Sequence, residues 1–99
     1  EDSIIIIRTF LAKAKRLHRI FNEMKNNKKA ESVIATIKPP IFWKDKELVK
    51  QQTEKWNYNR IEDLIFKINQ TELNIKKNSL LAINILSNFI IEQSSLTNN

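Results

Sequence analysis

Side chains able to carry acid–base, nucleophilic or metal chemistry are scarce in this chain. It contains one His, His18, and no Cys, so the ligands for a His/Cys zinc site are missing. Glu62 and Asp63 are sequence neighbours on a helical pattern, and adjacent residues on a helix do not face each other. We therefore expect no catalytic residue, no metal site and no cofactor, and we interpret His18 as a boundary residue of an apolar helix face.

Glycine is absent from all 99 residues. The phosphate-binding loops of nucleotide-binding proteins, the dinucleotide fingerprint and the EF-hand turn all require glycine, so each is excluded. Helices also lose their usual left-handed terminating residue, and asparagine is the next best choice. We expect Asn26, Asn27, Asn57 and Asn78 to lie at helix ends. Asn59, three residues before Glu62, has the spacing of a capping box and is the expected cap of the fourth helix.

The one run with nucleic-acid-binding chemistry follows a Pro39-Pro40 elbow. Trp43, with Lys44 and Lys46 after it, offers a flat ring for stacking on a base and cations for phosphate. The structural alternative is that Phe42 and Trp43 both fill a seam beside the prolines. We expect Phe42 to be buried and Trp43 to be partly exposed, which leaves Trp43, Lys44 and Lys46 as candidate DNA contacts.

Apolar residues recur at helical spacing throughout the chain, and alternation typical of strands does not persist anywhere. The pattern predicts an all-α domain of five helices. Pro39 and Pro40 should end the second helix, because a residue before proline is disfavoured in the helical region. The expected helices cover residues 3–26, 28–37, 44–56, 59 onward and 79–93, and residues 94–99 form a frayed tail.

Two helices carry more apolar surface than a small bundle can bury. On the fourth, Phe66 and Leu73 form a second stripe beside the main apolar face. On the fifth, the main face comprises Ala82, Ile83, Leu86, Phe89 and Ile90. Leu81 and Ile85 point roughly opposite to it. Because a helix that is apolar nearly all round is central in a core or part of an interface, we take as candidate subunit contacts Phe66, Leu73, Leu81 and Ile85.

Two further residues are expected to have structural roles. Glu72 falls on the apolar face of the fourth helix, where a carboxylate should be paired, and Lys76 one turn later suits that role. Trp56, at the end of the third helix, is expected to pack rather than to contact a ligand.

The net charge of +6 makes an anionic partner plausible. On the first helix, the apolar face comprises Ile7, Phe10, Ala14, Leu17, Phe21 and Met24. The opposite side carries Arg8, Lys15, Arg16 and Arg19. This stripe is interpreted either as a solvated face or as a phosphate-contacting surface. No run is long and apolar enough to span a membrane, since Arg8 cuts the Ile4–Ile7 run, and a cytoplasmic location fits.

Three ordered segments resemble the C-terminal domain of the delta subunit of bacterial DNA polymerase III. The elbow Pro39–Lys46 is similar to that family's Pro-Pro-x-Phe-aromatic-Lys-x-Lys run. Lys55-Trp56 followed by Ile61–Leu64 resembles its basic-Trp step into a helix. Thr71–Lys76 resembles its Glu-Leu-x-x-Lys segment. The order and spacing of the three segments cover about the whole chain.

The resemblance implies a five-helix collar domain, a non-catalytic scaffold that forms a ring with other clamp-loader subunits. The implied partners are the gamma/tau and delta prime subunits and, in the assembled loader, primer-template DNA. The sliding clamp would be contacted only through an N-terminal domain that this chain lacks. The parent would belong to the DNA polymerase holoenzyme, of the nucleotidyltransferase class, with no active site in this domain.

Residues 1–99 are accordingly expected to be one helical domain, the C-terminal fragment of a longer chain. The abundance of Ile, Lys and Asn is typical of an AT-rich bacterial genome. The alternative function is an autonomous basic DNA-binding domain that uses the first helix. A generic adaptor that captures a partner helix is a third possibility.

Overall fold

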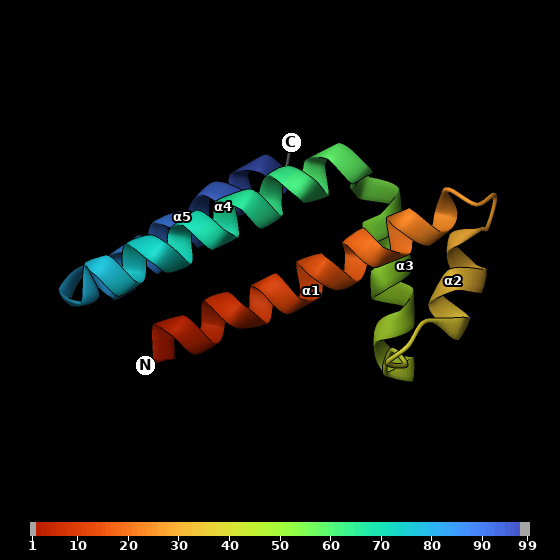
Figure 1. Ribbon diagram of the computed structural model, residues 1–99, viewed down its shortest axis with the longest axis horizontal. Coiled ribbons are helices and arrows are strands. Elements are labelled where there is room, and N and C mark those ends of the chain that lie inside the picture. The colour runs from red at the N-terminus through yellow and green to blue at the C-terminus, as the bar shows by residue number, and fades with distance from the viewer. Residues whose placement is uncertain (1, 98–99) are drawn as a thin grey trace. The chain divides into compact units, whose positions relative to one another are not determined.

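The computed structural model describes residues 2–97, which form α-helices and short 3-10 helices with no strand in that range (Figure 1). The all-α class and the five helices predicted from the sequence are confirmed. The elements in chain order are α1 (Asp2–Met24), α2 (Ala30–Thr36), η1 (Trp43–Asp45), α3 (Lys46–Lys55), α4 (Tyr58–Lys77), η2 (Ser79–Leu81) and α5 (Ala82–Thr97).

Asparagine does end the first helix, as the absence of glycine suggested. Past the end of α1, Asn27 has φ of 63°, the only positive value among the described residues. Asparagine tolerates this left-handed conformation better than most residues. Asn78 follows the C-terminal end of α4 and has φ of −132°, so this asparagine does not end its helix in the left-handed conformation.

The Pro39-Pro40 elbow separates α2 from η1 and α3. Ile37 leaves the helical region, with φ of −63° and ψ of 147°, and the Lys38–Pro39 peptide bond is cis. After the elbow the chain forms η1 before α3 begins at Lys46, two residues later than expected. The first turn is therefore a 3-10 turn in which the Asp45 N–H donates to the Phe42 carbonyl at 2.8 Å.

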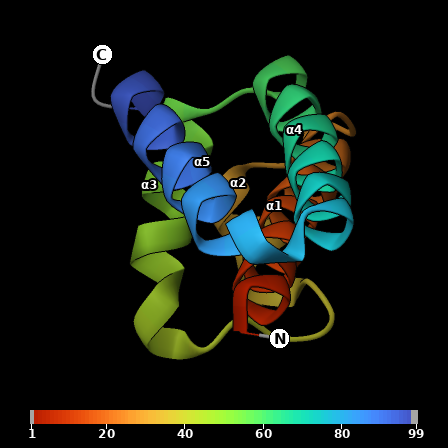
Figure 2. The same ribbon diagram turned by 90° about the vertical axis from the view of Figure 1, so that its left-hand side faces the viewer.

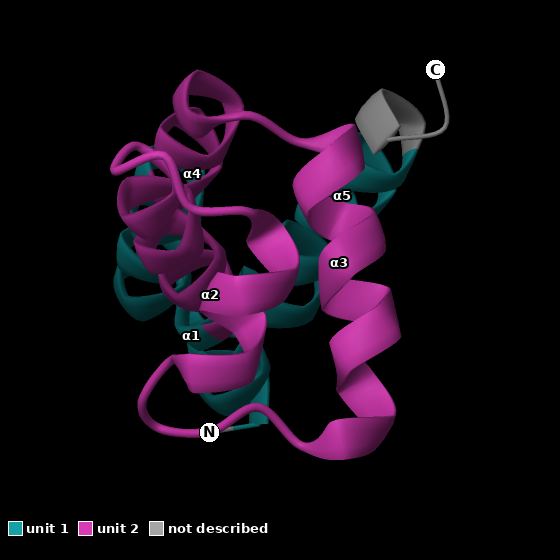
Figure 3. Ribbon diagram, turned by 90° about the vertical axis from the view of Figure 1, so that its right-hand side faces the viewer, with its two compact units in different colours: residues 1–12, 66–99 teal, residues 13–65 magenta. Residues whose placement is uncertain are grey.

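The chain divides into two compact units (Figure 3). Unit 2 is the continuous stretch 13–65, whereas unit 1 combines two separate stretches, 1–12 and 66–99. The division between the units falls within α1 and again within α4.

Unit 1 buries an aliphatic core around the start of α1, the C-terminal half of α4, and α5. Ile7, Ile68 and Ile75 are almost fully buried, and each such side chain stabilises the fold by about 1.5–3 kcal/mol. The Phe10 and Phe89 rings meet edge to face at 6.2 Å. In Figure 2 the chain reverses direction at η2, between the C-terminal part of α4 and α5, and this reversal lies within unit 1.

Unit 2 has its own core, and α2 packs against α3 within it. The apolar face predicted for the first helix is buried at Ala14, Leu17 and Phe21, and Ile20, which that pattern left out, is fully buried as well. The other buried apolar side chains of this unit are Val33, Ile34, Ile41, Val49 and Ile61.

The C-terminal helix is longer than expected. α5 continues past Gln93 to Thr97, so residues 94–97 belong to the helix, and positions 98–99 of the expected frayed tail lie outside the described residues. Across residues 2–97, none of the helices combines the length and hydrophobicity that a bilayer crossing requires.

Candidate functional site

The surface of unit 1 is rich in exposed apolar side chains, and α5 contributes most of them. Ala82, Leu86 and Phe89 form its buried face. On the outward side, Ile83 is 73% exposed and Ile91 is 64% exposed, while Leu80 in the preceding η2 is fully exposed. Exposure of this kind on neighbouring turns is typical of a surface that another protein covers.

The structure shifts the candidate interface of α5 relative to the sequence prediction. Leu81 is about half exposed, but Ile85 is partly buried and flanks the core face. Ile83, which the pattern assigned to the core face, points outward instead. When a helix is apolar on nearly all sides, its sequence does not reveal which side faces the core. Sequence reasoning therefore missed Ile83, Leu80 and Ile91 as exposed candidates for the interface.

Two further groups belong to the apolar surface of unit 1. Phe66 and Leu73, the predicted second stripe of α4, are 59% and 50% exposed. At the start of α1, Ile5 and Ile6 are also exposed. A sequence signal for the second group existed, because a run of four isoleucines in a helix must direct some of them outward.

The carboxylate of Glu72 lies between two cations in unit 1. Its Oε2 atom is 3.0 Å from Arg8 Nε and 3.0 Å from Lys76 Nζ, and its side chain is only 13% exposed. The predicted pairing with Lys76 is confirmed, and Arg8 joins it. Hydrogen bonds from Lys76 and then Arg8 hold the pKa of the Glu72 carboxyl below its ordinary value of 4.5.

The elbow of unit 2 exposes two aromatic rings. Trp43 is exposed, as expected, but the expectation that Phe42 is buried is wrong, because its side chain is 57% exposed. Ile41 is buried in its place, since the extended backbone alternates the direction of successive side chains. The Phe42 and Trp43 rings lie 5.9 Å apart, and Lys44 Nζ lies 5.4 Å from the Trp43 ring centroid. Phe42, Trp43 and Lys44 thus form one exposed aromatic-basic turn.

The third candidate DNA contact, Lys46, lies in a different environment. It lines a hollow of about 200 Å³ together with residues of α2 and α3. Within that hollow Lys50 donates to the Glu31 carboxylate, and this bond lowers the pKa of Glu31 and raises that of Lys50. The structure therefore groups Lys44 with Trp43 and sets Lys46 beside the α2–α3 contact.

Trp56 is half-buried, and the guanidinium of Arg60 lies against one face of its ring. The Arg60 guanidinium lies 4.6 Å from the Trp56 ring centroid, and its Nη1 donates to the Lys55 carbonyl at 2.9 Å. The packing role expected for Trp56 agrees with this arrangement.

The side chain of Asn57 caps α4. It accepts a hydrogen bond from the Arg60 N–H at 2.8 Å, so Asn57 rather than the predicted Asn59 is the N-terminal cap.

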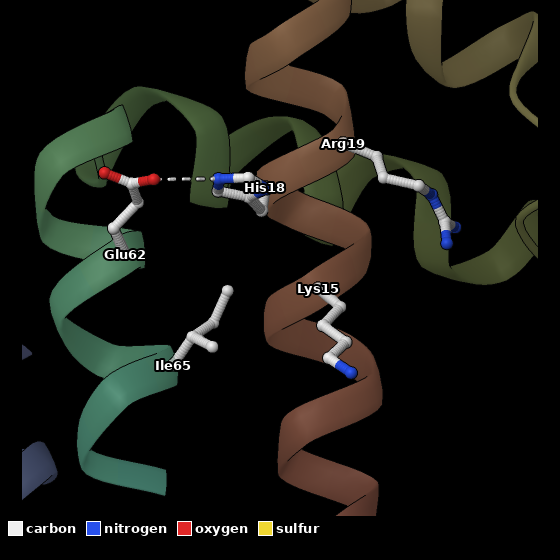
Figure 4. A pocket seen from close by; sticks show the side chains of 5 residues that line it. All are labelled: Lys15, His18, Arg19, Glu62 and Ile65. Atoms are coloured by element: carbon white, nitrogen blue, oxygen red, sulfur yellow. Dashed lines mark hydrogen bonds and ion pairs between the residues drawn. The ribbon is translucent and has the colours of Figure 1, made fainter. Parts of the chain in front are cut away.

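His18 belongs to a small polar cluster between α1 and the start of α4. Its Nε2 atom is 3.4 Å from the Glu62 carboxylate (Figure 4). Its ring centroid lies 4.8 Å from that of Tyr58, with the two rings tilted by 34°. Lys25 Nζ lies over the Tyr58 ring, 3.6 Å from its centroid. Burial, and then the hydrogen bond to Glu62, raise the pKa of Tyr58. His18 is thereby held as a packed, hydrogen-bonded side chain at the edge of the apolar face.

Charge is distributed very unevenly between the two units. Unit 1 contains four basic and four acidic residues, so its formal charge is zero. Unit 2 contains thirteen basic and seven acidic residues and carries the whole formal charge of +6. The neutral unit 1 also has more exposed large apolar side chains than unit 2, so the exposed apolar side chains and the excess of positive charge lie mostly in different units.

Comparison with protein-family models, with curated proteins and with solved structures finds no match to this chain.

Proposed function

We propose that this chain is an assembly domain of the collar type, from the delta subunit of a bacterial clamp loader. The single observation that carries the assembly role is the set of exposed apolar side chains on unit 1, from α1, α4, η2 and α5. Aliphatic side chains left exposed on successive elements of a neutral unit favour a protein partner over a charged ligand.

The identity of the partners rests on the ordered sequence motifs. The elbow, the Trp56 step and the Glu72–Lys76 segment resemble the delta subunit, whose ring neighbours are the gamma/tau and delta prime subunits. In that setting, Trp43 with Lys44 would meet primer-template DNA through stacking and charge. The exposure of both side chains is compatible with that contact.

The test is assembly with the other clamp-loader subunits of the same source, followed by size-exclusion chromatography and light scattering. The variant Ile83→Glu, Ile91→Glu places two charges in the outward face of α5. Burying unpaired carboxylates at an interface costs several kcal/mol. We therefore expect at least a hundredfold weaker assembly, with unchanged helical content by circular dichroism.

Leu48→Glu is the matched control, because Leu48 is an exposed aliphatic residue of α3 in unit 2. It should leave assembly unchanged. Full assembly by the α5 variant would show that the interface lies elsewhere. An equal loss with Leu48→Glu would show that the effect is not specific to unit 1.

A further inference from the structure

Two hollows in unit 2 share one arginine. The first, of about 450 Å³, is lined by Lys15, His18, Arg19, Glu62 and Ile65 (Figure 4). The second, of about 430 Å³, is lined by Arg19 again and by residues on both sides of α2, among them Glu23, Lys28 and Lys38. Arg19 is thus the common wall of two neighbouring depressions.

Of the two carboxylates at these hollows, Glu23 lies 3.8 Å from Lys28 and forms an ion pair. Glu62 lies 3.4 Å from His18 Nε2, a contact that is an ion pair only when His18 is protonated, so the first hollow combines two cations with one carboxylate. In contrast, Lys15, Arg19 and Lys38 make no ion pair within residues 2–97. Three cations along the two hollows are therefore left without a neutralising partner.

The side chains of Lys15 and Arg19 also point in directions that suit binding of an anion. In Figure 4 the Lys15 and Arg19 side chains leave α1 on the same side and extend away from the Glu62 carboxylate. One helical turn separates the two residues, so both can approach one extended anion. The whole formal charge of +6 belongs to the same unit, which strengthens attraction of a polyanion.

We propose that Lys15, Arg19 and Lys38 bind the phosphodiester backbone of DNA, with one phosphate at each hollow and Arg19 between them. A single small anion would need only one hollow, whereas two depressions that share a cation match a ligand with repeated charges. The planar guanidinium suits this position, because it can donate to two phosphate oxygens at once. Such a contact recognises the charge and spacing of the phosphates and does not depend on the base sequence.

This site is separate from the aromatic-basic turn of Phe42, Trp43 and Lys44, and it does not depend on the proposed assembly role. It uses unit 2 alone. Arg8, although part of the basic stripe seen in the sequence, is excluded from the site because it lies in unit 1 and pairs with Glu72.

The test uses the full 99-residue chain and fluorescein-labelled 20-mers of DNA, single-stranded and duplex, in anisotropy titrations from 20 to 200 mM salt. We compare the wild type with the triple variant Lys15→Gln, Arg19→Gln, Lys38→Gln. The matched control is Lys13→Gln, Lys29→Gln, Lys55→Gln, which removes the same charge from exposed positions of unit 2.

We expect the first variant to bind at least tenfold more weakly at low salt, and the control less than threefold. Each lost phosphate contact should also reduce the slope of log K against log salt by roughly 0.7–0.9. Equal weakening by the two variants, or no binding of either DNA by the wild type at low salt, would overturn the proposal.

Inorganic phosphate distinguishes a free anion from the DNA backbone. If phosphate at millimolar concentration shifts the amide resonances around Arg19 while DNA does not bind, the hollows take small anions and the DNA proposal fails. Assembly with the other subunits is measured on the same variants. Retained assembly together with lost DNA binding would separate this inference from the proposed scaffold role.

Discussion

Glu72 shows how one residue on an apolar face can be tolerated and even useful. Its carboxylate is mostly removed from water, which would be costly if it were unpaired. Arg8 and Lys76 approach it from two helices of unit 1. Both cations keep half or more of their own surface in water, so the pair is stabilising only in a modest, salt-sensitive way.

We expect Glu72→Gln to lower the free energy of unfolding by about 1 kcal/mol at pH 7. Because the folded-state pKa of Glu72 is lowered, the contribution is complete above the ordinary value near 4.5. It disappears as the pH falls through the lower folded-state pKa. Urea unfolding of both proteins between pH 7 and pH 3 measures the difference.

In that series the wild type and Glu72→Gln should converge in stability at the acidic end. Glu92→Gln is the control, since Glu92 is an exposed carboxylate of the same unit. A constant difference at every pH would mean that charge pairing is not the source of the effect.

At the scale of elements, much of the helical pattern could be predicted. The five helices, the Pro39-Pro40 break and the buried positions Ala14, Leu17 and Phe21 follow from spacing and from proline's restrictions. Helix ends were less predictable, because several polar residues near each end could cap it. The choice of Asn57 over Asn59 depends on where the chain leaves α3, which spacing does not encode.

The faces of α5 were the hardest part of the candidate site to predict. Residues such as Ile83 and Ile85 have the same side chain, so hydrophobicity cannot rank them. The folded unit 1 distinguishes them, because Ile83 is exposed in it and Ile85 is half-buried. Phe42 was mispredicted for a related reason, because the backbone at the elbow turns Ile41 inward.

The cap of α4 can be tested with two neighbouring asparagines. Asn57→Ala removes the acceptor for the Arg60 N–H, and loss of such a cap costs about 1 kcal/mol of stability. Asn59→Ala, at an exposed position within the first turn of α4, should change stability by less than about 0.5 kcal/mol. Thermal unfolding followed by circular dichroism distinguishes the two, and a larger effect at Asn59 would restore the capping scheme inferred from sequence.

Across the whole molecule, the separation of charge from exposed apolar surface gives the two units different physical behaviour. The assembly contacts proposed for the neutral unit 1 depend on burial of aliphatic surface, which added salt does not weaken. The DNA contacts proposed for the basic unit 2 depend on charge, which salt screens over about 10 Å at 0.1 M. The two proposals therefore assign one chain a salt-resistant contact and a salt-sensitive one.

We expect raising the salt concentration from 50 to 200 mM to weaken DNA binding at least tenfold while assembly with the other subunits changes less than twofold. Parallel anisotropy and light-scattering titrations on one preparation give both values. If assembly weakens as steeply as DNA binding, charge and not apolar burial holds the subunits together, and the proposed role of α5 is wrong.

The division of the chain into a continuous unit 2 and a two-piece unit 1 has a consequence for synthesis on the ribosome. Residues 13–65 are complete before translation has reached the second piece of unit 1, so this part can fold as soon as it emerges. The isoleucines at the start of α1 must wait for α4 and α5 to be made. Until then, their side chains are exposed apolar surface, which in general favours aggregation and is what chaperones protect.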